Sequence, residues 1–320
     1  MCQIAISCLD QVRTCRWYQR ALGFVPAGAL PDVRGPEVSA IQGLPDVVTS
    51  VTWLLDQQNQ VQMEFFAFQH PSVRPIPPDW KPSDVGFSMI GIHVANFDRA
   101  LDSTLRSGGR PLSGPIGPAG KRRVCLRDPE GVLLELMEDD PRVPGAAARP
   151  RPHLPVAVRS MTLSVPDLAR ARRFWVDTLG LPEAKGLMLH GSEHEALWGL
   201  SGARRKSLLL WAGDFLIELV QYTDPLGRPR PAGYWLADQG ISHIAVRPDT
   251  KSDFDKAYQC AINGGYRGNC EPVDLGGVKA VYMNDDQGFT VELLWCDEKE
   301  EKNFGFQPAD TPSPMAAAAY

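Results

Sequence analysis

The sequence predicts an α+β fold built from four similar β-α-β-β-β units. The first observation is a short apolar strand that carries one acidic residue in its middle and recurs four times. Its copies are Gln60–Phe66, Gly131–Leu136, Gly213–Leu219 and Gly288–Leu294. The second observation is a helix-like apolar pattern, ended by glycine, in the first half of each unit. Such repeats predict curved, mixed sheets with helices outside and acids on the inner faces.

The acids of the four copies are Glu64, Glu135, Glu218 and Glu292. Side chains alternate between the two faces of a strand, so each acid shares its face with the residues two positions away. An acid on an apolar face is costly to bury unless a cation or a proton meets it. We therefore expect each acid to need a charged or hydrogen-bonding partner.

Apolar periodicity and glycine or proline breaks place the elements of each unit. In the first unit we expect strands at Gln3–Cys8, Val48–Leu55 and Val61–Phe66 and a helix at Val12–Leu22. In the second we expect strands at Phe87–Val94, Arg123–Arg127 and Val132–Glu138 and a helix at Asp98–Ser107. In the third we expect strands at Arg159–Val165, Ser207–Trp211 and Phe215–Tyr222 and a helix at Leu168–Leu179. In the fourth we expect strands at Ile241–Val246, Lys279–Asn284 and Phe289–Leu294 and a helix at Phe254–Asn263.

The length of 320 residues favours two domains. We predict an N-terminal domain over residues 1–140 that contains the first two units. A segment rich in Pro, Ala and Arg, residues 141–156, is predicted to be a linker. The last two units form a C-terminal domain over residues 157–298. The charged and then Ala-rich tail, residues 299–320, is predicted to be disordered.

Three features stand outside the repeated pattern. A proline-rich stretch, Pro71–Pro82, joins the first two units, and a second proline-containing loop, Asp224–Gly233, lies in the third. That second loop is either a lid over a cavity or an ordinary connection. His190 and His194 have the spacing of metal ligands on a helix, but Gly191 between them indicates a solvated loop.

Composition excludes several classes of protein. Hydrophobic residues make up 43% and charged residues 22% of the chain, which is typical of a soluble globular protein. A net charge of −5 argues against nucleic-acid binding, and the sequence contains no apolar run long enough to span a membrane. Seven scattered cysteines and a start unlike a signal peptide predict reduced thiols and a cytoplasmic location.

Several motifs resemble those of the vicinal oxygen chelate superfamily, which includes glyoxalase I, extradiol dioxygenases and bleomycin- and fosfomycin-resistance proteins. They are Gln3–Asp10 with Arg16–Phe24, Ser160–Asp167 with Arg173–Leu181, and Ile241–Val246, besides the acid-bearing strands of the second and fourth units. The resemblance covers nearly the whole chain except linker and tail. It implies two vicinal oxygen chelate domains made of four modules, and it leaves the reaction open because one fold hosts many chemistries.

In that family each module offers two inward ligands, one from its first strand and one from its last. By register the pairs are Gln3 and Glu64, Met89 and Glu135, Ser160 and Glu218, and His243 and Glu292. Met89 and Ser160 depart from the family pattern, because a thioether and a plain hydroxyl are poor ligands for a hard divalent ion. The pairing of the modules then decides which residues meet.

If the outer modules pair, Gln3, Glu64, His243 and Glu292 form a set that resembles the metal site of glyoxalase I. The other cavity would then be degenerate. Against this, Gln3 stands so close to the chain start that it also fits an exposed edge position.

If neighbouring modules pair instead, the third and fourth supply Glu218, His243 and Glu292, as in extradiol dioxygenases. Ser160 then stands where that chemistry requires a histidine. Tyr282 matches a tyrosine of extradiol enzymes. Without a metal, Glu218 would be structural, as would Glu135, each paired with an arginine.

The resemblance implies a metal-dependent lyase or isomerase of the glyoxalase or epimerase type that binds a small oxygen-rich substrate. The cofactor would be a divalent ion (Zn, Ni, Co, Mn or Fe), and Glu292 or Glu64 would move a proton. One alternative is an Fe(II) extradiol dioxygenase with its site in the C-terminal half. Another is a metal-free small-molecule-binding protein of the bleomycin-resistance type. Either a monomer or a homodimer is compatible with four modules.

Overall fold

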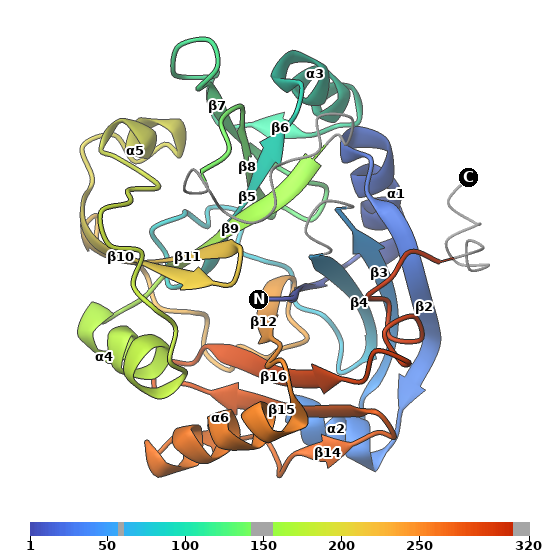
Figure 1. The fold of residues 1–320 in the computed structure, drawn as a ribbon. Coiled ribbons are helices and arrows are strands. Elements are labelled where there is room, and N and C mark those ends of the chain that lie inside the picture. Colours follow the sequence, from blue (N-terminus) through green and yellow to red (C-terminus); the bar gives the residue numbers. More distant parts are fainter. Residues whose placement is uncertain (57–60, 142–155, 310–320) are drawn as a thin grey trace.

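The computed structural model describes residues 1–56, 61–141 and 156–309 and consists mainly of two curved sheets. Each sheet combines two modules. Figure 1 shows that strands from the two ends of the chain lie in one sheet, and strands from its middle lie in the other. Among the described residues, no helix is long and apolar enough to cross a membrane.

The first sheet joins the first and fourth modules. Its strand order is β13-β15-β16-β12-β1-β4-β3-β2, with β14 paired to β15. The first module supplies β1 (Gln3–Ser7), β2 (Val25–Arg34), β3 (Val48–Leu55) and β4 (Gln62–His70). The fourth supplies β12 (Gly240–Val246), β13 (Arg267–Gly268), β14 (Val273–Asp274), β15 (Val278–Asn284) and β16 (Thr290–Cys296).

The second sheet joins the second and third modules in the order β10-β11-β9-β5-β8-β7-β6. The second module supplies β5 (Gly86–Val94), β6 (Arg110–Pro111), β7 (Arg123–Arg127) and β8 (Leu133–Met137). The third supplies β9 (Val156–Ser164), β10 (Arg204–Ala212) and β11 (Phe215–Asp224). One cluster of buried side chains, which includes Ile4, Phe65, Leu134 and Leu219, draws on both sheets.

Each module carries one principal helix whose start is capped by a polar side chain. The principal helices are α1 (Gln11–Leu22), α3 (Phe97–Arg106), α4 (Leu168–Arg172), which continues as a π-helical segment Arg173–Thr178, and α6 (Lys251–Asn263). Asp10, Asn96, Asp167 and Thr250 accept hydrogen bonds from backbone amides of the first turn. Shorter helices are α2 (Pro36–Gln42) and α5 (Glu193–Leu197).

The predicted helices and strands are present, with bounds shifted by a few residues. The sequence pattern does not predict β2, α2, α5 or the two-residue strands β6, β13 and β14. Strand β2 contains Pro26, Gly28 and Pro31, which indicate a turn, and it is tolerated because it lies at the edge of the sheet. Helix α2 is too short to show a clear period.

The structure describes part of the predicted tail but almost none of the predicted linker. Of the predicted linker 141–156, residues 142–155 lie outside the described residues, and the domain boundaries remain a prediction. Residues 299–309, expected in the disordered tail, instead pack against the first sheet, where Phe306 is buried. Residues 310–320 lie outside the described residues.

The turn between β7 and β8 of the second module connects the two sheets through hydrogen bonds. The buried Glu130 carboxylate accepts hydrogen bonds from the backbone amides of Leu9 and Asp10, at 2.9 and 3.0 Å. It also accepts from Thr14 at 2.9 Å and from the carboxamide of Gln239 at 2.7 Å. The second module therefore holds the start of α1 and the approach to β12. Gln287 occupies the equivalent turn of the fourth module and accepts from the Asp167 amide at 2.9 Å.

We predict that Glu130→Ala destabilises the protein by about 3 kcal/mol, because it leaves several buried donors without an acceptor. The matched change Gln287→Ala removes one acceptor and should cost about 1 kcal/mol. Urea unfolding of both variants checks the difference. Equal losses would show that Glu130 does not carry the contact between the sheets.

Candidate metal centre

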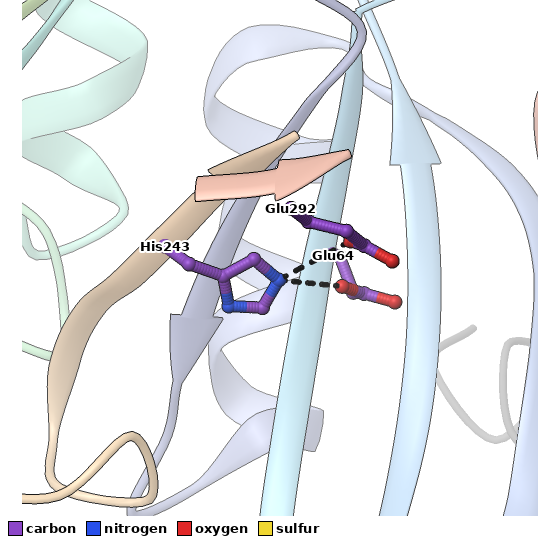
Figure 2. A group of neighbouring side chains, drawn as sticks. All are labelled: Glu64, His243 and Glu292. Atoms are coloured by element: carbon purple, nitrogen blue, oxygen red, sulfur yellow. Dashed lines mark ion pairs between the residues drawn. The ribbon is translucent and has the colours of Figure 1, made fainter. Parts of the chain in front are cut away.

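Three potential ligands converge at the centre of the first sheet: Glu64 of β4, His243 of β12 and Glu292 of β16. Figure 2 shows their side chains pointing toward one another from different strands. His243 Nε2 lies 3.8 Å from Glu64 Oε2 and 3.5 Å from Glu292 Oε2. One ligand atom from each residue lies within 4.8 Å of the others. The sheet pairing of the outer modules brings them together.

The register explains why these side chains meet. Strand β1 lies between β4 and β12, and its Ala5 is paired with Glu64 on one side and His243 on the other. Ala245 is likewise paired with Gln3 and with Glu292. Residues in register point to the same face of a sheet. Two small residues at the crossing points therefore leave room for the longer side chains to converge.

His243 is fully buried, and its Nε2 has no hydrogen-bond partner. Its Nδ1 lies 3.2 Å from the hydroxyl of Ser242, which itself donates to the backbone carbonyl of Ala5 at 3.3 Å. Because the hydroxyl proton is used there, the imidazole donates from Nδ1 and keeps a lone pair on Nε2. Burial lowers the pKa of His243 to about 4, so the ring is neutral. This is the form that binds a metal.

The two carboxylates differ in how they are held. Glu64 Oε1 accepts a hydrogen bond from the indole of Trp53 at 2.9 Å. Glu292 accepts no hydrogen bond from the described residues. Burial raises the pKa of both acids, and the charge of Glu292 raises that of Glu64 further. Neither acid has an arginine or lysine partner among the described residues, so two buried acids share one neutral histidine.

Gln3 contributes a fourth potential ligand, an oxygen atom, to the same site. Its side chain is buried in a central strand, so the alternative interpretation of Gln3 as an exposed edge residue is wrong. The amide nitrogen donates to Gln62 Oε1, while Gln3 Oε1 is buried without a hydrogen-bond partner. An unsatisfied buried acceptor costs about 1–3 kcal/mol. A cation beside Glu64 and Glu292 would satisfy it.

Gln3, Glu64 and Glu292 line a cavity of about 150 Å³ with otherwise largely apolar walls, and His243 lies behind the two acids. Tyr282, paired with Glu292 in the sheet, lines it too, and its ring centroid lies 4.5 Å from that of His243. The segment after β16 closes one side, where the carbonyl of Phe304 accepts a hydrogen bond from Gln62. Gly305 has a φ of +72°, and a Cβ there would lie 2.7 Å from Trp53. Only glycine fits this approach.

The second sheet carries the equivalent acids but neutralises them internally. Glu135 is fully buried and contacts Arg123 Nη1 at 3.1 Å, His190 Nε2 at 3.3 Å and the Trp198 indole at 2.9 Å. Glu218 contacts His190 Nδ1 at 2.5 Å and Arg205 Nη1 at 3.2 Å. The predicted pairing of these acids with arginine is confirmed. Charged partners from the same chain complete this network.

The position of His190 overturns one expectation. Its side chain was predicted to lie in a solvated loop, but it is buried between the two acids. The two arginines hold the loop, because Arg123 donates to the Leu189 carbonyl and Arg205 to the His190 carbonyl. Leu189 is buried beside it. An apolar residue next to His190 was the one feature of the local sequence that could have predicted a buried loop.

The ligand set of neighbouring modules is not assembled. Glu218 lies on the second sheet, whereas His243, Glu292 and Tyr282 lie on the first. The alternative extradiol site, which requires the third and fourth modules to share a sheet, is therefore not formed. Ser160 and Met89 lie on the second sheet as well.

The residues of the first sheet fit a divalent metal ion. The unpartnered His243 nitrogen, the unpartnered Gln3 oxygen and two buried acids without a cation are a mixed nitrogen and oxygen donor set. Zn, Ni, Co, Mn and Fe accept such sets. Within the described ranges, Glu64, His243 and Glu292 are the one group of three or more His, Cys, Asp or Glu side chains that lie close enough together to hold a metal ion.

Two repeats on each of two curved sheets, with inward acids, define a vicinal oxygen chelate protein. The chain belongs to the Glyoxalase/Bleomycin resistance protein/Dioxygenase superfamily, whose family profile matches residues 2–136 and 157–293. No curated protein matches the chain by sequence.

Solved structures share the whole architecture. Glyoxalase I from Zea mays aligns with a TM-score of 0.60 and 16% identity over 95% of this chain and 95% of that chain. A Bacillus subtilis protein provisionally named a dioxygenase aligns with a TM-score of 0.60 and 14% identity, over 96% of this chain and 88% of that chain. At these identities the likeness establishes the fold.

The second-sheet network predicts a pH dependence of stability. Burial lowers the pKa of His190, but the carboxylates of Glu218 and Glu135 more than offset this and raise it to about 9. Because folding raises this pKa, protonated His190 contributes its full stabilisation below the ordinary pKa of 6.5. This stabilisation is lost as the pH rises towards 9. We expect His190→Gln to be less stable at pH 6.5 and to lose less stability on going to pH 9.

Urea unfolding across that range measures the effect. His70→Gln, a change at an exposed histidine, serves as the control and should keep the profile of the unmodified protein. An unchanged pH profile in His190→Gln would contradict the ion-pair assignment.

Proposed function

We propose that the protein is a metal-dependent enzyme of the glyoxalase or epimerase type, with one active centre formed by the first and fourth modules. The contrast between the two sheets carries the proposal. The second sheet gives its two inner acids three cationic partners, whereas the first gives Glu64 and Glu292 only the neutral His243. An external cation would meet the cost of burying them.

Four residues would hold the ion: Gln3 through Oε1, His243 through Nε2, and the carboxylates of Glu64 and Glu292. When bound, such an ion supplies a Lewis acid that stabilises an oxyanion on a substrate with two adjacent oxygen atoms. Supporting contacts fix the imidazole through Ser242 and the Glu64 carboxylate through Trp53.

Glu292 is the residue that we assign to proton transfer. Glu64 is held by Trp53, but Glu292 accepts no hydrogen bond from the described residues, so its carboxylate is free to turn. Burial raises its pKa, which makes it a stronger base towards a carbon-bound proton. The apolar walls of the cavity limit water around that proton and favour a small substrate.

Metal content tests the proposal directly. Protein purified without a histidine tag or chelator should hold one first-row metal ion per chain, measured by elemental mass spectrometry. His243→Ala should lose the ion because it removes the nitrogen ligand. Ser160→Ala, in β9, and His190→Gln, in the loop that packs against the second sheet, should retain it. An ion that remains in His243→Ala would place the centre elsewhere.

Failure to bind any of the five ions after incubation would exclude the enzyme proposed here. It would favour the metal-free small-molecule-binding protein. Iron as the native ion, with oxygen uptake on catechols, would favour a dioxygenase at this same centre.

Glu292→Gln should reduce α-proton exchange about 10²–10⁴-fold, because it removes the base while keeping the side-chain shape. Exchange into α-hydroxycarbonyl compounds in deuterated water, followed by NMR, measures the step without knowledge of the natural substrate. Metal content of the variant is measured in parallel, so that loss of the ion is not mistaken for loss of the base. Full exchange with the ion retained would assign proton transfer to another residue.

A further inference from the structure

A second cavity, of about 180 Å³, lies where two loops meet. The proline-rich stretch Pro71–Pro82 forms one wall, and the loop after β11 forms another. The first residues of β5 and β12 form its floor. None of its lining residues lines the cavity of the candidate metal centre. The walls are mostly apolar or aromatic and include Ile76, Trp80, Phe87, Tyr234 and Ile241.

Two arginines hold these loops together through ion pairs. Arg74 donates from Nε to Asp238 at 2.8 Å. Arg228 contacts Asp84 at 2.7 Å and Asp79 at 2.6 Å, which joins the second loop to the first. Both guanidinium groups therefore have carboxylate partners. Ion pairs therefore hold the two loops that form the walls of the cavity in a fixed position.

A third arginine, Arg230, lines the cavity without such a partner. Its Nη1 donates to the backbone carbonyl of Gly288, and no carboxylate of the described residues lies within 4.0 Å of it. Asp285 attracts Arg230 through space but directs its Oδ1 to the amides of Gln287 and Phe289. One positive charge in the cavity therefore lacks a close counter-charge.

Aromatic rings surround this guanidinium group. Its carbon lies 4.5 Å from the ring centroid of Phe289, 4.8 Å from that of Tyr234 and 5.9 Å from that of Phe87. These contacts fix the plane of the group and keep it partly out of water. A fixed, planar guanidinium pairs well with a carboxylate, because two parallel N–H groups match its two oxygens.

We propose that this cavity binds an aromatic carboxylate, whose anionic group pairs with Arg230 and whose ring lies against the apolar walls. The charge selects an anion, and the rings and the volume select a small flat body. Binding sites for small molecules combine apolar walls with few polar anchors in this way. The site is separate from the proposed metal centre, and its test does not rest on the proposed function.

Benzoate is the probe, and isothermal titration calorimetry on the full chain is the measurement. Arg230→Gln should weaken benzoate binding about tenfold or more, because it removes the charged partner. Arg204→Gln, at an exposed arginine outside the cavity, should leave it unchanged. Benzyl alcohol, which has the ring but no charge, should bind far more weakly than benzoate.

Further controls separate this cavity from the metal centre. His243→Ala and chelator-treated protein should bind benzoate as the unmodified protein does. Ile76→Trp fills the cavity, keeps Arg230 and should abolish binding, which tests the site even where Arg230→Gln folds poorly. Benzoate binding that survives both changes, that disappears with His243→Ala, or that is not detected at millimolar concentration would overturn the proposal.

Discussion

The constraint on which the structure depends is the burial of two carboxylates at the centre of each curved sheet. Each sheet has an antiparallel pair of strands at its centre. The strand on either side of this pair carries one of the two buried acids. Carboxylates in such positions are expensive unless a cation or a proton meets them. Both sheets bury two carboxylates, but they differ in the groups that compensate the negative charge.

On the second sheet the chain supplies the cations itself. A loop carries His190 between Glu135 and Glu218, and Arg123 and Arg205 bind both the acids and the backbone of that loop. On the first sheet the segment after β16 lines the cavity with the uncharged side chains of Phe304 and Phe306. A cavity and unpartnered donor atoms therefore remain there, and these are the conditions for binding an ion.

Crossed pairing of the modules makes contacts between the sheets important for the site. Glu130 of the second module holds the start of α1, which follows β1, and Gln239, which directly precedes β12. The ion pairs of Arg74 and Arg228 join the connection between the first two modules to the loop between β11 and β12. The positions of the ligands thus depend on residues outside the sheet that carries them.

The sequence by itself determined the repeats, because strand alternation, caps and acid positions are local patterns. Glu64, His243 and Glu292 could be proposed as ligands because the ligand positions of the family can be carried over to this sequence by register. Only the tertiary structure decided which modules share a sheet, because pairing depends on packing between distant segments. It also showed that Gln3, for which an exposed edge position was the alternative, is buried in a central strand, and that His190, expected in solvent, is in a buried ion pair. Burial and charge compensation are properties of the assembled sheets, so no local pattern contains them.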